Sequence, residues 1–161
     1  MSFKKAVEAI GAPVKSAYEP GKRALPKLHA KKISCAADQR IHGSIFLDDA
    51  LKGVKKHSQA SRWDYGLGYT NPAGKEFAIW VEVHTASTDE VRTVIRKMDW
   101  LRDYLDSEAP ALRKLTPALN GNPDPFVWIA SNGNHILKNS PQARLLAQSG
   151  LRGPINGLVL P

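Results

Sequence analysis

Cysteine is almost absent from this sequence, because Cys35 is the only one in 161 residues. A single cysteine excludes an internal disulfide framework and any zinc cluster built on cysteine ligands. Long apolar runs are also missing: the longest contain five residues, as in 77–81, whereas a membrane-spanning helix needs about 18 or more. Near the N-terminus, Glu8 interrupts the apolar stretch that a secretory signal would require. We therefore expect a cytoplasmic protein with no membrane partner.

Acidic side chains are scarce relative to basic ones, with 15 Asp and Glu against 23 Lys and Arg and a formal net charge of +8. Residues 1–32 account for +6 of this charge and contain three prolines. Such a composition buries little apolar surface, so we expect a flexible basic arm over 1–32 and a single α/β domain over 33–161. Within the arm, residues 3–10 carry an apolar helical face, which allows a short amphipathic helix there.

Two roles are open for the basic arm. It could be a solubilising extension, or it could contact nucleic-acid phosphates or another acidic partner. The basic residues that we consider for such a contact are Lys4, Lys5, Lys22, Arg23, Lys31 and Lys32.

The body of the chain alternates between strand-like and helix-like patterns. Apolar residues alternate over 62–69 and again over 76–85, with turn residues between them, which predicts a β-hairpin. A helical apolar stripe follows over 89–105, and the apolar segment 126–130 suits a buried strand. Shorter helices are expected at 49–57 and 140–148, short strands at 32–37 and 158–160, and a loop at 112–125. Together these elements predict an α/β fold with a mixed β-sheet flanked by helices.

The hairpin places two carboxylates opposite each other. If Tyr69 pairs with Phe77, the same register puts Asp64 across from Glu82. Opposed like charges destabilise a sheet, so a cation should lie between them. Mg²⁺ or Mn²⁺ is one candidate, because such ions are commonly held by one or two carboxylates together with water and substrate phosphate oxygens. The alternative is that Arg62 or a helix lysine neutralises the pair.

Further residues share the face of the two carboxylates. Arg62 lies across from His84 in this register, and we consider Arg62 as a nucleic-acid contact. His84 could act as a general base, a metal ligand or a phosphate contact. Gly66 and Gly68 are also on this face, where they would leave room for a phosphate backbone to approach.

This pattern resembles the PD-(D/E)XK nuclease superfamily, in which one hairpin strand carries an acidic residue and the next carries an acid-x-Lys motif. Asp64 matches the first acid, and Glu82, Val83 and His84 occupy the positions of the acid-x-Lys motif. His84 stands where the family has lysine. In such families the lysine can come instead from the adjacent helix, where Lys97 is the best-placed candidate. The other interpretation of Lys97 is an ordinary solvated lysine on a helix.

The resemblance implies a restriction-endonuclease-like core and a metal-dependent nuclease that hydrolyses nucleic-acid phosphodiesters, with DNA as the expected substrate. The two motif acids would hold Mg²⁺ or Mn²⁺, and His84 or Lys97 would transfer a proton or stabilise charge. Some members carry another acid on the first helix, where Asp48 or Asp49 is the candidate, although Asp48 also suits a helix cap. If neither His84 nor Lys97 can act, the resemblance implies an inactive nuclease-fold subunit that binds nucleic acid or a protein partner through its arm. A homodimer or a larger protein assembly stays open.

Overall fold

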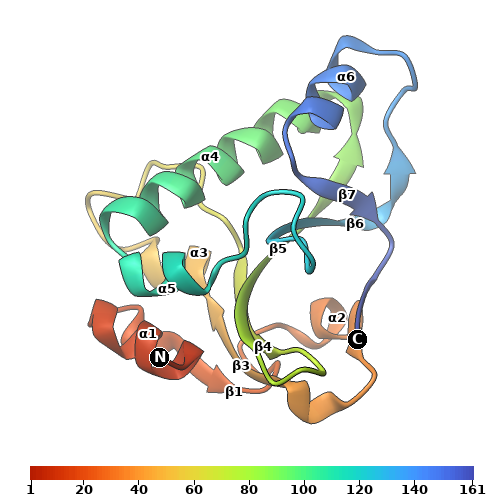
Figure 1. Cartoon of the computed structure of the whole chain (residues 1–161). Coiled ribbons are helices and arrows are strands. Elements are labelled where there is room, and N and C mark those ends of the chain that lie inside the picture. The colour runs from red at the N-terminus through yellow and green to blue at the C-terminus, as the bar shows by residue number, and fades with distance from the viewer.

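The computed structural model describes all 161 residues and has an α/β fold built on a six-stranded mixed sheet. The strand order is β1-β3-β4-β5-β6-β7, and β2 and β8 form a separate two-stranded sheet. Figure 1 shows α1, α4 and α5 on one side of the large sheet and α2 on the other. The strands are β1 (Tyr18–Pro20), β2 (Ile33–Cys35), β3 (Ile41–Phe46), β4 (Tyr65–Thr70), β5 (Glu76–Ser87), β6 (Phe126–His135), β7 (Arg152–Ile155) and β8 (Leu158–Leu160). The helices are α1 (Phe3–Ile10), α2 (Lys27–Ala30), α3 (Leu47–Leu51), α4 (Val91–Ser107), α5 (Pro110–Leu115) and α6 (Pro141–Gln148).

The hairpin of β4 and β5 has the register that the sequence predicts. Tyr69 pairs with Phe77, and Tyr65 pairs with Val81. The turn is closed by the side chain of Asn71, which accepts a hydrogen bond from the backbone N–H of Lys75 at 2.8 Å. Strand β5 then runs parallel to β6, and the chain crosses between them through α4.

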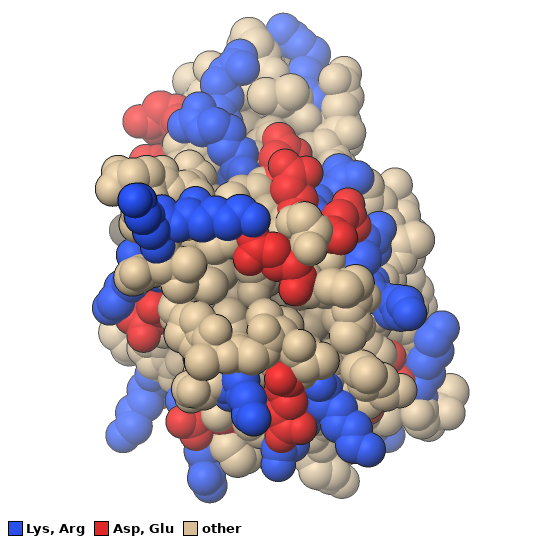
Figure 2. All heavy atoms as spheres, turned by 90° about the vertical axis from the view of Figure 1, so that its left-hand side faces the viewer, with Lys and Arg blue, Asp and Glu red and all other residues tan.

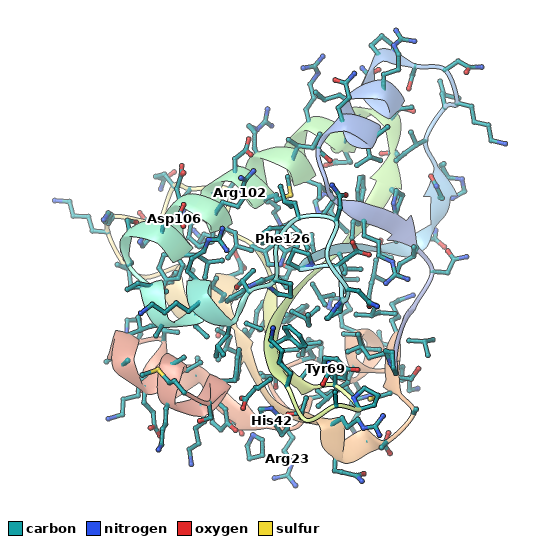
Figure 3. All side chains as sticks on the ribbon, viewed as in Figure 1. Arg23, His42, Tyr69, Arg102, Asp106 and Phe126 are labelled. Carbon is teal, nitrogen blue, oxygen red and sulfur yellow. The ribbon has the colours of Figure 1, made fainter.

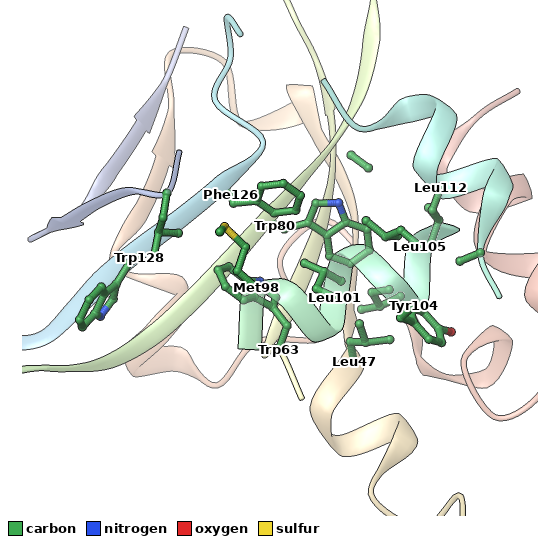
Figure 4. Close-up of a cluster of buried hydrophobic side chains, with 14 of the residues drawn as sticks. Leu47, Trp63, Trp80, Met98, Leu101, Tyr104, Leu105, Leu112, Phe126 and Trp128 are labelled. Carbon is green, nitrogen blue, oxygen red and sulfur yellow. The ribbon is translucent and has the colours of Figure 1, made fainter. Parts of the chain in front are cut away.

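The apolar stripe of α4 is buried against the sheet. Met98, Leu101 and Leu105 belong to one cluster of buried side chains that also contains Trp63 and Trp80 from the hairpin segment. Figure 4 shows this packing beneath α4. A second cluster lies on the opposite face of the sheet, where residues of the β2–β8 sheet and of the segment before it provide the cover. The large sheet is therefore covered on both faces, so its polar side chains can reach solvent only at the margins of these two clusters.

Residues 1–32 do not form a flexible arm in this structure. Phe3, Ala6 and Val7 of α1 are fully buried in the main core, and Ser2 caps the helix by accepting a hydrogen bond from the N–H of Lys5. Strand β1 extends the large sheet by pairing antiparallel with β3. The expectation of a separate arm was wrong because the lysines and prolines between these apolar positions dominate the composition, whereas the few apolar residues decide the packing.

Several element boundaries also differ from the predicted ones. The helix expected over 49–57 is shorter, because α3 spans Leu47–Leu51 and turns follow it. The predicted loop at 112–125 begins inside α5, which starts with Pro110 in its first turn. Strand β6 continues to His135, and β1, β3 and β7 were not anticipated. None of the helices combines the length and the apolar character that crossing a membrane would require.

Candidate active site

Asp64 and Glu82 lie side by side where the hairpin begins. Asp64 directly precedes β4 and Glu82 lies in the middle of β5. The backbone N–H of Asp64 donates to Glu82 Oε2 at 2.9 Å, and the N–H of Val83 donates to Asp64 Oδ2 at 3.1 Å. These reciprocal bonds hold both carboxylates in place and bring the two acids together, as the sequence predicted, just beyond the last ladder pair of Tyr65 and Val81.

Lys97 of α4 supplies the cation that this pair needs. Its ammonium group contacts Glu82 Oε1 and lies 3.8 Å from Asp64 Oδ1. The side chain of Glu82 is fully buried, whereas those of Asp64 and Lys97 are 15% and 16% exposed. Burial acts to lower the pKa of Lys97, but the neighbouring carboxylates outweigh it and the pKa lies above its usual value. Lys97 is thus a charged and partly buried member of the site rather than a solvated helix lysine.

His84 extends the site toward the start of α4. Its Nδ1 lies 3.5 Å from Glu82 Oε1, and its Nε2 lies 2.8 Å from Glu90 Oε2. The pKa of His84 lies above its usual value, mainly because of the hydrogen bond to Glu82. Burial acts to lower this pKa, and the hydrogen bond to Glu90 raises it further. Glu90 was not among the predicted site residues, although its place six residues after His84, in the 3₁₀ turn between β5 and α4, could have suggested it.

Asp64 has the most perturbed carboxyl group of the site. The pKa of Asp64 is raised to about 7, mainly by burial and further by the negative charge of Glu82. The positive charge of Lys97 and the hydrogen bond from Val83 oppose this increase. A carboxyl group with such a pKa can gain or lose a proton near neutral pH, which is the range useful for acid–base chemistry.

Arg62 does not lie across from His84, so that expectation is wrong. Its guanidinium donates from Nε to Asp48 Oδ1 at 3.0 Å and from Nη1 to the carbonyls of His57 and Ser58 at 2.8 and 3.0 Å. The hydrogen-bonded ladder of β4 begins only at Tyr65, so Arg62 lies in the loop before the hairpin. Arg62 ties the loop before β4 to α3 through its Nε and Nη1 donors.

The beginning of α3 is anchored next to the carboxylate pair. The backbone N–H groups of Leu47 and Asp48 donate to the carbonyl of Asp64, at 2.8 and 3.4 Å. The negative charge of Asp48 contributes to the raised pKa of Asp64. Asp49 instead forms an exposed ion pair with Lys52 at 2.7 Å. Of the two first-helix candidates, Asp48 therefore borders the site.

Gly66 and Gly68 do not open this face to a phosphate backbone. A Cβ atom placed on Gly66 would lie 2.6 Å from the ring of Trp80, and one on Gly68 would lie 2.7 Å from the ring of Phe3. Both aromatic side chains are fully buried. The two glycines therefore make room for core side chains, and the carboxylate face is accessible only around Asp64, Lys97 and His84.

The basic residues of the N-terminal segment lie outside this cluster. None of Lys4, Lys5, Lys22, Arg23, Lys31 and Lys32 forms an ion pair with the site residues. Lys22 is used internally, because its ammonium donates to the carbonyls of Ala30 and Ile33 at 3.1 and 2.6 Å. Figure 3 shows Arg23 at the lower end of the molecule, below the hairpin turn.

Only the two carboxylates of Asp64 and Glu82 are available to bind a divalent cation at this site. The chain has no group of three or more His, Cys, Asp or Glu side chains arranged to hold a metal ion. None of the five main surface pockets is lined by Asp64, Glu82 or Lys97. Mg²⁺ often binds one or two carboxylates and completes its coordination with water and substrate phosphate, and a pair of acids fits that mode.

Comparisons with protein families, with curated proteins and with solved structures found no match to this chain. The resemblance to the PD-(D/E)XK superfamily therefore depends on the residues of this chain and their arrangement.

Proposed function

We propose that this protein is a metal-dependent nuclease that hydrolyses phosphodiester bonds of nucleic acid, with DNA as the expected substrate. One observation carries the proposal: Lys97 of α4 contacts the Asp64–Glu82 pair of the hairpin. This trio has the composition of the PD-(D/E)XK site, with the lysine supplied by the helix that follows the second strand instead of by the strand itself. The proposal therefore includes a restriction-endonuclease-like core.

Each side chain would have a separate role in this proposal. Asp64 and Glu82 would hold Mg²⁺ or Mn²⁺, which when bound polarises a phosphate and lowers the pKa of a coordinated water. The Lys97 ammonium, 3.8 Å from Asp64 Oδ1, would move from Glu82 to the phosphate oxygens and stabilise the charge that develops on them. His84 would hold a proton at Nδ1 or Nε2, with Glu90 fixing the orientation of the ring.

A second candidate function is a non-catalytic subunit that binds nucleic acid or a protein partner. It is favoured by the way Glu82 is engaged: the N–H of Asp64 binds one of its oxygens, and Lys97 binds the other. The buried carboxylate is thus satisfied by the protein itself. In this alternative the trio stabilises the fold, and exposed basic side chains such as Lys4, Lys5 and Lys31 provide the contact.

A cleavage assay on the full chain separates the two functions. Linear, circular and single-stranded DNA and RNA are incubated with Mg²⁺, Mn²⁺ or EDTA. The wild type is compared with Glu82→Gln and Asp64→Asn, and with Asp49→Asn as a matched control in the exposed Lys52 ion pair. The nuclease proposal expects metal-dependent products from the wild type and Asp49→Asn and none from the two site variants. Absence of products from a folded wild type, or equal activity in all four proteins, would contradict it.

A further inference from the structure

Helix α4 carries its charges in two separate halves. Residues 91–98 contain three basic side chains and no acidic one, namely Arg92, Arg96 and Lys97. Residues 99–107 contain three acidic side chains and one basic one, namely Asp99, Asp103, Asp106 and Arg102. Figure 3 shows Arg102 and Asp106 projecting from this acidic half. Two surfaces of opposite charge therefore lie along a single helix.

The helix macrodipole does not account for this distribution. The macrodipole favours acidic side chains near the N-terminus of a helix and basic ones near its C-terminus. Yet α4 has no acidic residue in its first turn and no basic residue in its last turn. Asp89 and Glu90 directly precede the helix, but Ser87 and His84 bind their carboxylates. The acidic residues that suit the start of a helix therefore lie in the preceding 3₁₀ turn, and the exposed charged side chains in the first two turns of α4 itself are basic.

The segment around α6 adds basic side chains at the same end of α4. The backbone N–H of Leu137 donates to Thr88 Oγ1 at 2.8 Å, which fixes Lys138 beside the 3₁₀ turn that leads into α4. Helix α6 packs against both this turn and α4, and it carries the exposed Arg144. None of Arg92, Arg96, Lys138 and Arg144 takes part in an ion pair.

These four side chains define what is here called the α4–α6 basic surface. α6 forms the upper end of the molecule in Figure 1, and Figure 2 shows Lys and Arg side chains at that end as well as along the lower edge, with several acidic side chains near the middle of the face. The surface reaches the candidate active site along α4. Arg96 Nη2 donates to Thr93 Oγ1 at 3.3 Å, and Thr93 lies one helical turn before Lys97.

We propose that the α4–α6 basic surface binds the phosphodiester backbone of the nucleic acid whose phosphate enters the Asp64–Glu82–Lys97 site. The inference rests on the proposed function for the identity of the ligand. Four exposed cations without acidic partners suit a polyanion, because each phosphate that they neutralise releases condensed counterions. The acidic half of α4 would repel the same backbone, so the strand leaves the site toward α6.

The test measures DNA binding without cleavage. Wild-type protein and Arg92→Ala/Arg96→Ala are titrated onto a fluorescein-labelled DNA duplex in EDTA at several salt concentrations, and anisotropy gives the Kd. The charge-matched control is Arg102→Ala/Arg113→Ala, which removes two arginines next to Asp106 in the acidic half. We expect the slope of log Kd against log salt concentration to decrease by about 2 for Arg92→Ala/Arg96→Ala, about 0.9 per lost phosphate contact, and to stay unchanged for the control.

Three results would overturn the inference: no DNA binding by the wild type at low salt, equal weakening in the two double variants, or no weakening in either. Failure of the nuclease proposal has a different signature, because binding is measured in EDTA. A protein that binds DNA through Arg92 and Arg96 and yields no product with any metal would retain this surface and lose the catalytic assignment. If the wild type cleaves DNA and Arg92→Ala/Arg96→Ala binds DNA with unchanged affinity, the catalytic assignment stands and the proposed binding surface is wrong.

Discussion

The ammonium group of Lys97 contacts the fully buried carboxylate of Glu82, although the two residues come from different layers of the fold. Glu82 lies in β5 and Lys97 lies in the second turn of α4, which covers that strand. A buried carboxylate without a cation would be expensive. The contact therefore links the position of the helix to the charge balance of the sheet, and it makes the candidate active site part of the core.

Removing Lys97 should reduce the stability of the protein strongly. In Lys97→Met the apolar stem is retained, but Glu82 loses its partner while it remains fully buried. Breaking a buried ion pair from one side costs about 3–5 kcal/mol, and we expect a loss of this order in the free energy of unfolding. Urea denaturation at pH 7 measures it. Lys52→Met is the control, since Lys52 forms an exposed pair with Asp49. Equal stability of Lys97→Met and wild type would contradict the assigned role of the contact.

The stability of the wild type should decrease as the pH rises from about 4 to about 7. The pKa of Asp64 is about 7 in the folded protein and 3.8 in its ordinary state, so in this interval the folded state holds a proton that the unfolded state has released. The contribution of Asp64 to the free energy of unfolding then falls by up to about 1.4 kcal/mol per pH unit and levels off above pH 7.

The comparison that isolates this effect uses Asp64→Asn, which has no titrating carboxyl group. Urea midpoints are measured from pH 4 to pH 8 for the wild type, for Asp64→Asn and for Asp49→Asn. We expect the stability of the wild type relative to Asp64→Asn to fall across the interval, and Asp49→Asn to follow the wild type. Parallel curves for the wild type and Asp64→Asn would show that the carboxyl group titrates in its ordinary range.

Glu90 should hold His84 in its charged form. The pKa of His84 is raised by its hydrogen bonds to Glu82 and Glu90, so Glu90→Gln should lower it. A raised histidine pKa stabilises the folded state below the unfolded pKa of 6.5, and this contribution disappears as the pH rises through the folded pKa. NMR titration of the His84 ring gives the pKa directly. Asp89→Asn is the matched control, because Asp89 is bound by Ser87 and not by His84. A His84 titration unaffected by Glu90→Gln would exclude this pairing.

The hairpin and its carboxylate pair could be predicted because local rules decide them. Alternation fixes which residues share a face, and the turn around Asn71 fixes the register that brings Asp64 to Glu82. Lys97 could be named as a candidate because it borders the apolar stripe of α4, and its contact with Glu82 agrees with the alternative in which a helix lysine neutralises the pair. The α/β class followed from the order of these elements.

The features that could not be predicted depend on contacts between distant segments. Strand β1 exists because it pairs with β3, and neither strand has enough alternation to be recognised alone. Phe3 is buried against Gly68, some 65 residues away in the sequence. Arg62 was placed on the wrong side because the ladder ends at Tyr65, and no local signal marks that end.

Gly66 gives a direct test of whether the carboxylate face is covered or open. A Cβ atom at this position would lie 2.6 Å from the Trp80 ring and 3.1 Å from Ile45. The ring cannot move away easily, because its Nε1–H donates to Thr116 Oγ1 at 3.0 Å in the buried core. Overpacking of this kind typically costs about 1–3 kcal/mol, and we expect Gly66→Ala to be destabilised by that amount in urea denaturation.

Gly53→Ala is the control for Gly66→Ala, since an added Cβ at Gly53 meets no other atom within 4 Å. Replacing a glycine in an unstrained position stabilises a protein by about 0.4–1 kcal/mol, by restricting the unfolded chain. The two substitutions should therefore change the unfolding free energy in opposite directions. If Gly66→Ala were as stable as wild type and impaired only nucleic-acid binding, the face would be open, and a phosphate backbone could approach the strands themselves. Destabilisation of Gly66→Ala alone leaves the rim formed by Asp64, His84 and Lys97 as the way into the site.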